Sequence, residues 1–131
     1  DGSEAAKKAI EVAGELAELR KNDVVLYYVM PDTIHALRTL DNEQVRNEIQ
    51  NKGKEILDEA AKVIEKYPIV RYETKLEAGN PAVKIIEEVA AGDYELIVMG
   101  SLGMSGHKLF AMGSVANQVS HHANCSILIV K

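Results

Sequence analysis

Three glycines and a serine between residues 100 and 114 are spaced so that the main chain could approach a phosphate. The pattern is Gly100-x₂-Gly103-x₉-Gly113-Ser114. Gly100 and Gly103 lack a Cβ atom, so their backbone can adopt positive φ angles and come close to a ligand. Gly113-Ser114 precedes an apolar helical pattern, and the first N–H groups of a helix, at the positive end of its dipole, bind anions. The segment therefore predicts a phosphate site between a strand and a helix.

The glycine spacing excludes two common phosphate loops. No Gly-Lys-Ser/Thr closes the segment, so it is not a Walker A loop, and Gly100, Gly103 and Gly106 do not have the Gly-x-Gly-x-x-Gly spacing of a Rossmann fingerprint. The alternative interpretation, which the sequence leaves open, is that these glycines only permit tight turns.

The segment offers few groups for catalysis. His107 and Lys108 could meet a γ-phosphate or form a solvated loop tip, and Ser105 and His107 are the only nearby candidates for a positioned base. His121 and His122 are neighbours on a predicted helix and point about 100° apart, which disfavours a shared metal. We therefore assign no catalytic residue and no metal ligand.

Composition indicates one globular domain over residues 1–131. Apolar residues make up 47% of the chain and charged residues 27%, and the net charge of −5, from 15 basic and 20 acidic residues, disfavours nucleic acid as a partner. No apolar run approaches the roughly 20 residues of a membrane helix, and no secretory signal opens the sequence. With Cys125 as the single cysteine, the expected location is the cytoplasm.

Alternating helix and strand patterns surround the glycine segment. Ser3 and Asn80-Pro81 have the character of helix starts, and Gly92 is placed to end a helix. The helix Pro81–Ala91 is expected to bury Val83, Ile86, Val89 and Ala90. The expected helices are residues 4–20, about 41–66, 81–91 and 114–123, and the expected strands are 24–29, about 70–76, 96–99 and 126–131.

This alternation predicts a parallel sheet covered by helices on both faces, a three-layer α/β sandwich. Such a fold normally opens with a strand, whereas this sequence opens with Asp1-Gly2-Ser3 before a helix. If the first strand is central, its absence leaves a slot of about two strand spacings, roughly 10 Å. We therefore expect about eight further apolar residues before Asp1 in the natural polypeptide.

The glycine spacing, the strand Ile97-Val98-Met99 that runs into Gly100-Ser101, and the end Ser126–Lys131 resemble the universal stress protein family, in its ATP-binding branch. Asp1-Gly2-Ser3 resembles the acidic turn that follows the first strand in that family. The resemblance covers nearly the whole chain. It implies an adenine nucleotide alpha hydrolase-like fold of strand order 3-2-1-4-5, here without its first strand, and a homodimer through the last strand, Ser126–Val130.

The resemblance also implies the site residues. Asp1 is expected near the ribose or adenine and Val29 against the adenine through its backbone. Met99 is expected either near the base or as a buried core residue. The ribose and phosphates are expected on Gly100, Gly103, Gly113, Ser114 and Val115. The expected ligand is ATP, with AMP or cyclic AMP as alternatives, and Mg²⁺ is expected to be carried by the phosphates because the sequence offers no carboxylate cage.

These expectations favour an ATP-binding regulatory module of the stress response, in which the nucleotide orders the segment 101–112 and alters the dimer. Two alternatives stay open. One is a slow ATPase or autophosphorylating enzyme that uses the same pocket, and the other is a nucleotide-free dimeric scaffold.

Overall fold

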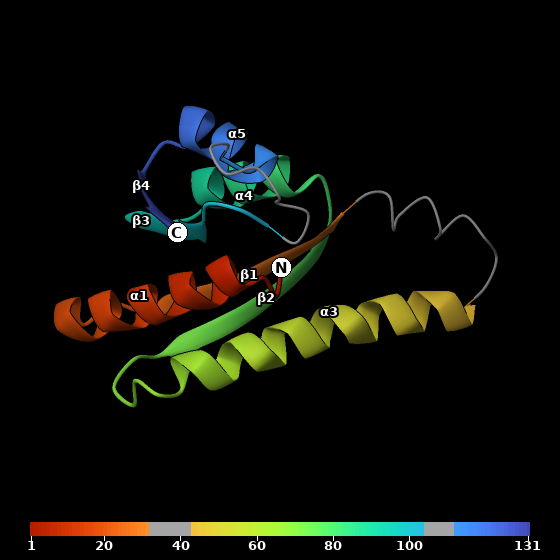
Figure 1. Cartoon of the computed structure of the whole chain (residues 1–131), viewed down its shortest axis with the longest axis horizontal. Coiled ribbons are helices and arrows are strands. Elements are labelled where there is room, and N and C mark those ends of the chain that lie inside the picture. The colour runs from red at the N-terminus through yellow and green to blue at the C-terminus, as the bar shows by residue number, and fades with distance from the viewer. Residues whose placement is uncertain (32–42, 104–111) are drawn as a thin grey trace.

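The computed structural model describes residues 1–31, 43–103 and 112–131, in which helices and strands alternate (Figure 1). Helices α1 and α3 lie on one side of the strands, and α4 and α5 lie on the other, as in a three-layer sandwich. Within these ranges no helix is both long and apolar enough to cross a membrane. The elements are α1 (Glu4–Arg20), β1 (Val24–Pro31), α3 (Glu43–Ile64), β2 (Tyr72–Gly79), α4 (Pro81–Ala91), β3 (Leu96–Gly100), α5 (Ser114–His122) and β4 (Ser126–Val130).

Short polar side chains begin two of the helices, as the sequence predicts. The Ser3 hydroxyl accepts a hydrogen bond from the Ala6 N–H at 3.2 Å, and Asn80 Oδ1 accepts one from the Val83 N–H at 3.2 Å. Gly92 ends α4, but its backbone is extended, at φ −105° and ψ 176°, rather than left-handed. A Cβ atom there would lie 2.3 Å from the Tyr94 ring, so close packing explains this glycine.

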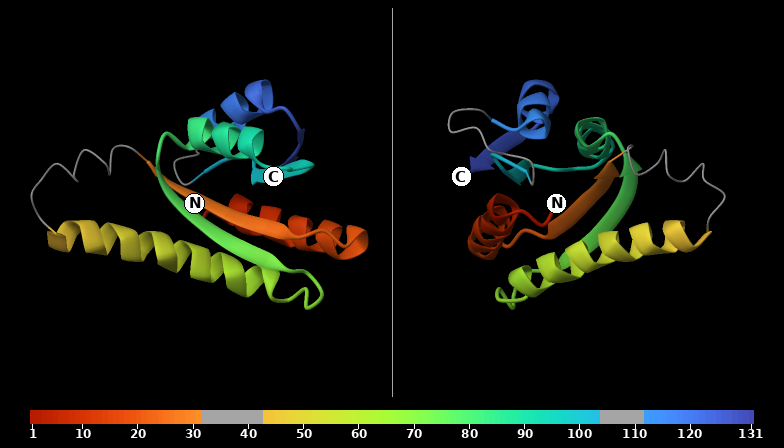
Figure 2. Two further views of the ribbon diagram at one scale, coloured as in Figure 1. Left: turned by 180° about the vertical axis from the view of Figure 1, so that it is seen from behind. Right: turned by 45° about the vertical axis from the view of Figure 1, so that its right-hand side comes forward.

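The strands form two parallel pairs rather than one continuous sheet (Figure 2). β1 pairs with β2 from Val24↔Tyr72 to Pro31↔Gly79, and β3 pairs with β4 from Leu96↔Ser126 to Gly100↔Val130. Among the described residues no ladder joins β1 to β3. The pairs match the predicted order with its central strand left out, and the expected slot lies between β1 and β3.

The main core lies where α1 and α3 cover the β1–β2 pair. Its buried members are Ala17, Leu26, Leu57, Ile64 and Val70. Gly53 lies on the buried face of α3, and a Cβ atom there would be 2.9 Å from a Leu76 methyl carbon. This glycine therefore allows α3 to approach β2 closely, which a local helix propensity could not indicate.

The buried face of α4 differs from the prediction at two positions. Ala82 and Val89 are buried, whereas Val83 is 47% exposed and Ala90 is also exposed. Val83 and Ala90 are seven residues apart and share one helix face. The prediction for these two residues was wrong because α4 is apolar on more than one face. Its contacts with the strands and α5 bury a different face from the predicted one.

Candidate functional site

All eight residues that the sequence singled out line one cavity of about 950 Å³. This cavity begins between β1 and β3 and reaches the start of α5, where the carboxyl ends of the strands meet. Ligands of open α/β sheets bind at that edge. The eight residues are Asp1, Val29, Met99, Gly100, Gly103, Gly113, Ser114 and Val115.

The first turn of α5 brings unpaired backbone N–H groups to the cavity. Asn117 donates the first backbone bond of this helix, to the Gly113 carbonyl at 2.9 Å. Gly113 occupies the cap position, and no side chain of the described residues caps the helix there. The N–H groups of Ser114, Val115 and the next residue therefore have no acceptor within the helix. Ser114 is exposed and adds a hydroxyl donor at the same end.

Backbone hydrogen bonds hold this helix start against the end of β3. The Gly113 N–H donates to the Ser101 carbonyl at 2.7 Å, and the Ser101 N–H donates to the Val130 carbonyl of β4, also at 2.7 Å. A Cβ atom on Gly113 would lie 3.2 Å from the Ser101 carbonyl oxygen. The absence of a side chain at Gly113 thus lets α5 begin directly above the turn that follows β3.

Asp1 brings a carboxylate to the same cavity. Its Oδ1 accepts a hydrogen bond from the Ser3 N–H at 3.1 Å, and its Oδ2 lies 2.6 Å from where a Cβ atom of Gly103 would be. Ser3 also donates a long bond, 3.5 Å, to the Leu102 carbonyl. A carboxylate accepts hydrogen bonds from hydroxyl or amino groups and repels phosphates. The cavity therefore has both a carboxylate, at Asp1, and backbone donors, at the start of α5, close to Gly103.

The glycines act through close approach rather than through a left-handed backbone. Gly100 and Gly103 do not have the expected positive φ angles. Among the described glycines, only Gly2, at φ 77°, and Gly79, at φ 151°, have a positive φ. A Cβ atom on Gly100 would lie 2.8 Å from the carbonyl carbon of Ala5. Gly100 therefore allows the first turn of α1 to pack against β3, which positions Asp1 at the cavity.

Val29 and Met99 form the wall between the strands. Val29 is 5% exposed and pairs with Glu77 across the β1–β2 ladder, while Met99 is half-buried and pairs with Ile129. Tyr27 and Tyr28 also line the cavity. Burial raises the pKa of the Tyr28 hydroxyl, and burial together with the Glu77 carboxylate raises that of Tyr27. Both side chains are therefore neutral near pH 7.

Two structural residues of the site escaped the sequence reasoning. Ser101 joins α5 to β4, and Gly2 needs its left-handed backbone to turn the chain into α1. A glycine directly before a helix cap was the available signal for Gly2. The residues Ser105, His107 and Lys108 lie outside the described part of the chain.

The adjacent histidines of α5 contact each other edge to face at the end of the helix. His121 and His122 are both exposed, with ring centroids 6.5 Å apart. The His122 ring contacts the Gln118 carbonyl through Nδ1 at 2.8 Å. Across the ranges that the structure describes, no three histidine, cysteine or acidic side chains gather in a way that could hold a metal ion.

Comparisons with known proteins agree with this fold and sequence pattern. The chain is 32% identical to the universal stress protein YxiE of Bacillus subtilis, over all of this chain and 94% of that protein. It is 34% identical to the universal stress protein MJ0531 of Methanocaldococcus jannaschii, over all of this chain and 78% of that protein.

Solved structures show the same architecture. A universal stress protein from Lactobacillus plantarum superimposes with a TM-score of 0.85 at 22% identity, over all of this chain and 92% of the other. One from Archaeoglobus fulgidus, in complex with dAMP, gives a TM-score of 0.74 at 25% identity, over 98% and 90% of the two chains. The sequence profile of the family matches residues 1–131. The chain therefore belongs to the universal stress protein family.

Proposed function

We propose that this protein is a regulatory module that binds ATP in the cavity between the Asp1–Ser3 turn and the first turn of α5. The observation that carries the proposal is the α5 start, where uncapped N–H groups line the same cavity as the acidic turn at the beginning of the sequence. Family membership and the dAMP complex of the Archaeoglobus fulgidus relative support an adenine nucleotide as the ligand.

The charged and polar groups that line the cavity indicate how the nucleotide is oriented in it. The phosphates belong at Gly113, Ser114 and Val115, because the uncapped first turn of α5 offers N–H donors and a helix dipole there. The sugar hydroxyls or adenine amino group belong near Asp1, whose carboxylate would repel phosphates. Val29 and Met99 then form the apolar wall for the base.

A magnesium ion fits this arrangement only as a companion of the phosphates. Mg²⁺ prefers oxygen ligands and keeps several waters, so one or two carboxylates with phosphate oxygens suffice. The described residues offer no cluster of three acidic or histidine side chains, which leaves the phosphate oxygens as its main ligands. When bound, the ion would neutralise part of the phosphate charge.

The regulatory step follows from how the site connects to β4. A nucleotide that bridges Gly103 and Ser114 fixes the turn after β3 against α5. Ser101, inside that turn, is bonded to the last residue of β4. β4 is paired with β3 along one side, and its Leu128 is 37% exposed, so its other edge is suited to a second copy of the chain. Nucleotide binding would thus alter a homodimer formed through Ser126–Val130.

Equilibrium binding to the purified chain tests the proposal. ATP, ADP, AMP, cyclic AMP, adenosine and GTP should be titrated separately, with and without Mg²⁺. We expect adenine nucleotides to bind more tightly than GTP, and the affinity to rise with the number of phosphates. No binding of any adenine ligand would leave the scaffold alternative, and release of labelled phosphate or transfer to the protein would favour the enzyme.

A further inference from the structure

The outer edge of β2 has no partner strand among the described residues. β2 is eight residues long and pairs in parallel with β1 along one side, from Val24↔Tyr72 to Pro31↔Gly79. Helices α3 and α4 contact β2 from its two faces. The pairing runs without a bulge, and β2 contains no proline, so none of the usual devices that close a strand edge interrupts it.

The main-chain groups of alternate β2 residues point away from β1. The Val24 N–H donates to the Arg71 carbonyl at 2.9 Å, so the main-chain groups of Arg71 are directed toward β1. In a parallel ladder the N–H and C=O of one residue point to the same side, and successive residues alternate. Tyr72, Thr74 and Leu76 therefore direct their N–H and C=O groups outward, where a further strand could bond to them.

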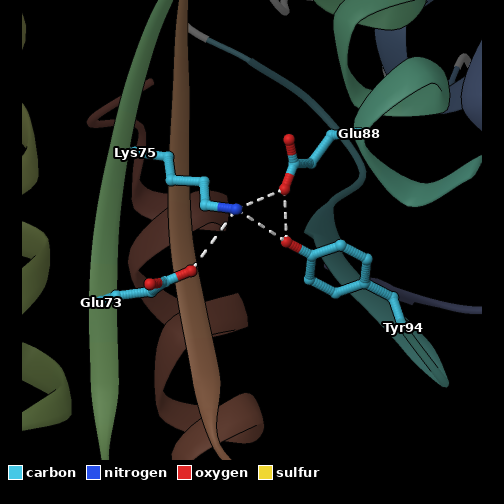
Figure 3. Close-up of polar contacts among 4 residues, drawn as sticks. All are labelled: Glu73, Lys75, Glu88 and Tyr94. Carbon is cyan, nitrogen blue, oxygen red and sulfur yellow. Dashed lines mark hydrogen bonds and ion pairs between the residues drawn. The ribbon is translucent and has the colours of Figure 1, made fainter. Parts of the chain in front are cut away.

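On the α4 side, the side chains beside this edge are acidic. Glu73 and Glu77 are 61% and 42% exposed. Between them, Lys75 reaches inward and donates to Glu88 of α4 at 2.6 Å and to the Tyr94 hydroxyl at 3.3 Å (Figure 3). Lys75 also contacts Glu73, at 3.4 Å, but shares its charge with Glu88. The edge therefore presents two carboxylates four residues apart.

On the α3 side, the edge is acidic at its start and less polar further along. The Tyr72 hydroxyl donates to Glu65 at 2.6 Å. This hydrogen bond raises the pKa of Tyr72, and burial and the charges of Glu65 and Asp58 add to it, so both carboxylates lie near the start of β2. Thr74 is exposed and Leu76 is half-buried on the same side. A strand that pairs here would thus meet uncharged side chains on one face and carboxylates on the other.

We infer that the free edge of β2 is a docking site for an extended segment of a partner protein that carries two basic side chains four residues apart. Such a strand would pair with the outward N–H and C=O groups and place one cation opposite Glu73 and the other opposite Glu77. Opposite charges directly across a strand pair stabilise it, and like charges destabilise it. No described residue of β2 lines the nucleotide cavity, so the docking site does not depend on the proposed function.

A second copy of the chain is a poor match for this edge. Antiparallel pairing of two β2 strands around Lys75 would set each Glu73 opposite a Glu77, and these like charges repel. The other outer strand, β4, has no charged side chain from Ser126 to Val130, so it offers no cation to either carboxylate. Charge complementarity therefore selects a basic segment of a different protein.

Titration with synthetic peptides tests the inference. The probe is a labelled seven-residue peptide with blocked ends, with valine at the odd positions, lysine at the second and sixth, and serine at the fourth. One control has lysine at the second and fourth positions and serine at the sixth, and the other has glutamate in place of both lysines. We expect saturable binding of the probe, weaker at high salt, and at least tenfold weaker binding of both controls. Equal binding of the three peptides, or no binding of the probe, would overturn the docking site.

Two sets of variants place the peptide on this edge. Thr74→Pro removes an outward N–H but no bond to β1, and proline is tolerated in edge strands at such positions. It should weaken probe binding at least tenfold while the urea midpoint is kept. Glu73→Lys with Glu77→Lys leaves the backbone intact and should reverse the preference, so that the glutamate peptide binds better than the probe. The exposed control pair Glu15→Lys with Glu55→Lys should change neither affinity by more than about twofold. Unchanged probe binding in the lysine double variant would contradict the inference.

Hydrogen exchange distinguishes this edge from the other possible contacts. With the probe bound, we expect added protection at the amides of Thr74 and Leu76. Protection confined to β4 would place the peptide on the opposite side of the molecule and would overturn the inference. Protection of β2 that rises with protein concentration in the absence of peptide would assign the edge to a second copy, which also contradicts the proposal.

Discussion

Replacement of Ser114 by aspartate should separate phosphate recognition from folding. Ser114 is exposed in the first turn of α5, where an acidic side chain stabilises a helix by about 0.3–1 kcal/mol through the dipole and the free N–H groups. The same carboxylate would occupy the donors that the phosphates need and would repel their charge. We therefore expect Ser114→Asp to keep or raise the free energy of unfolding while it weakens ATP binding.

The size of the effect follows from the charges at this helix start. Two unit charges 4 Å apart repel by about 1 kcal/mol in water and by about 4 kcal/mol at the effective dielectric of a protein surface. Each 1.4 kcal/mol is about a tenfold change in affinity. The dissociation constant for ATP should thus rise at least about fivefold, less at high salt because screening shortens the interaction. Adenosine, without phosphates, should bind unchanged.

Isothermal titration with ATP and adenosine at two salt concentrations, together with urea unfolding, measures these quantities. Ser120→Asp is the matched control, because Ser120 is an exposed serine in the last turn of the same helix. It should leave ATP affinity unchanged and slightly lower stability. If Ser114→Asp binds ATP as tightly as the original chain, or loses adenosine to the same extent, the phosphates are not at α5.

Three further outcomes follow. Gly100→Ala should lower the free energy of unfolding by about 1–3 kcal/mol, seen in urea titrations, because the new methyl meets the α1 backbone; unchanged stability would contradict that packing. Hydrogen bonds from Lys75, and then from Tyr94, lower the pKa of Glu88. Their contribution to stability is therefore fully present when the pH is above the usual glutamate pKa, near 4.5, and it is lost as the pH falls through the lowered pKa. Glu88→Gln should therefore lose stability at pH 7 and show a weaker dependence on acid in urea midpoints, whereas the exposed control Glu87→Gln should change neither. Leu128→Lys, on the outer strand β4, should convert a dimer to a monomer in sedimentation; an unchanged dimer would exclude this edge.

Helix starts and strand identities could be predicted because local contacts determine them. The caps at Ser3 and Asn80 bond to N–H groups three residues away, so the information lies within one turn of sequence. The slot between the strand pairs was also predictable, because alternating helices and strands imply a parallel sheet and no strand pattern precedes α1. The anion site at Gly113-Ser114, which stays a prediction, was inferred from the same kind of local pattern.

The faces that helices bury and the reasons for individual glycines could not be predicted in this way. Val83 was expected in the core and is exposed, because the rotation of α4 depends on the elements that it packs against. Gly100 and Gly103 were expected to bring the main chain close to a phosphate through positive φ angles, yet their close neighbours are Ala5 and Asp1, about 100 residues earlier. A local sequence pattern carries no information about contacts between residues so far apart in the sequence.

The amino-acid sequence alone determined the order of elements, their caps, and a glycine segment suited to phosphate, because hydrogen bonds and hydrophobic periods act over a few residues. Tertiary structure alone decided that Asp1 and the start of α5 line one cavity, and which face of α4 is buried. Those features depend on how α1 and α4 pack between distant segments, and packing depends on the shapes of both partners at once.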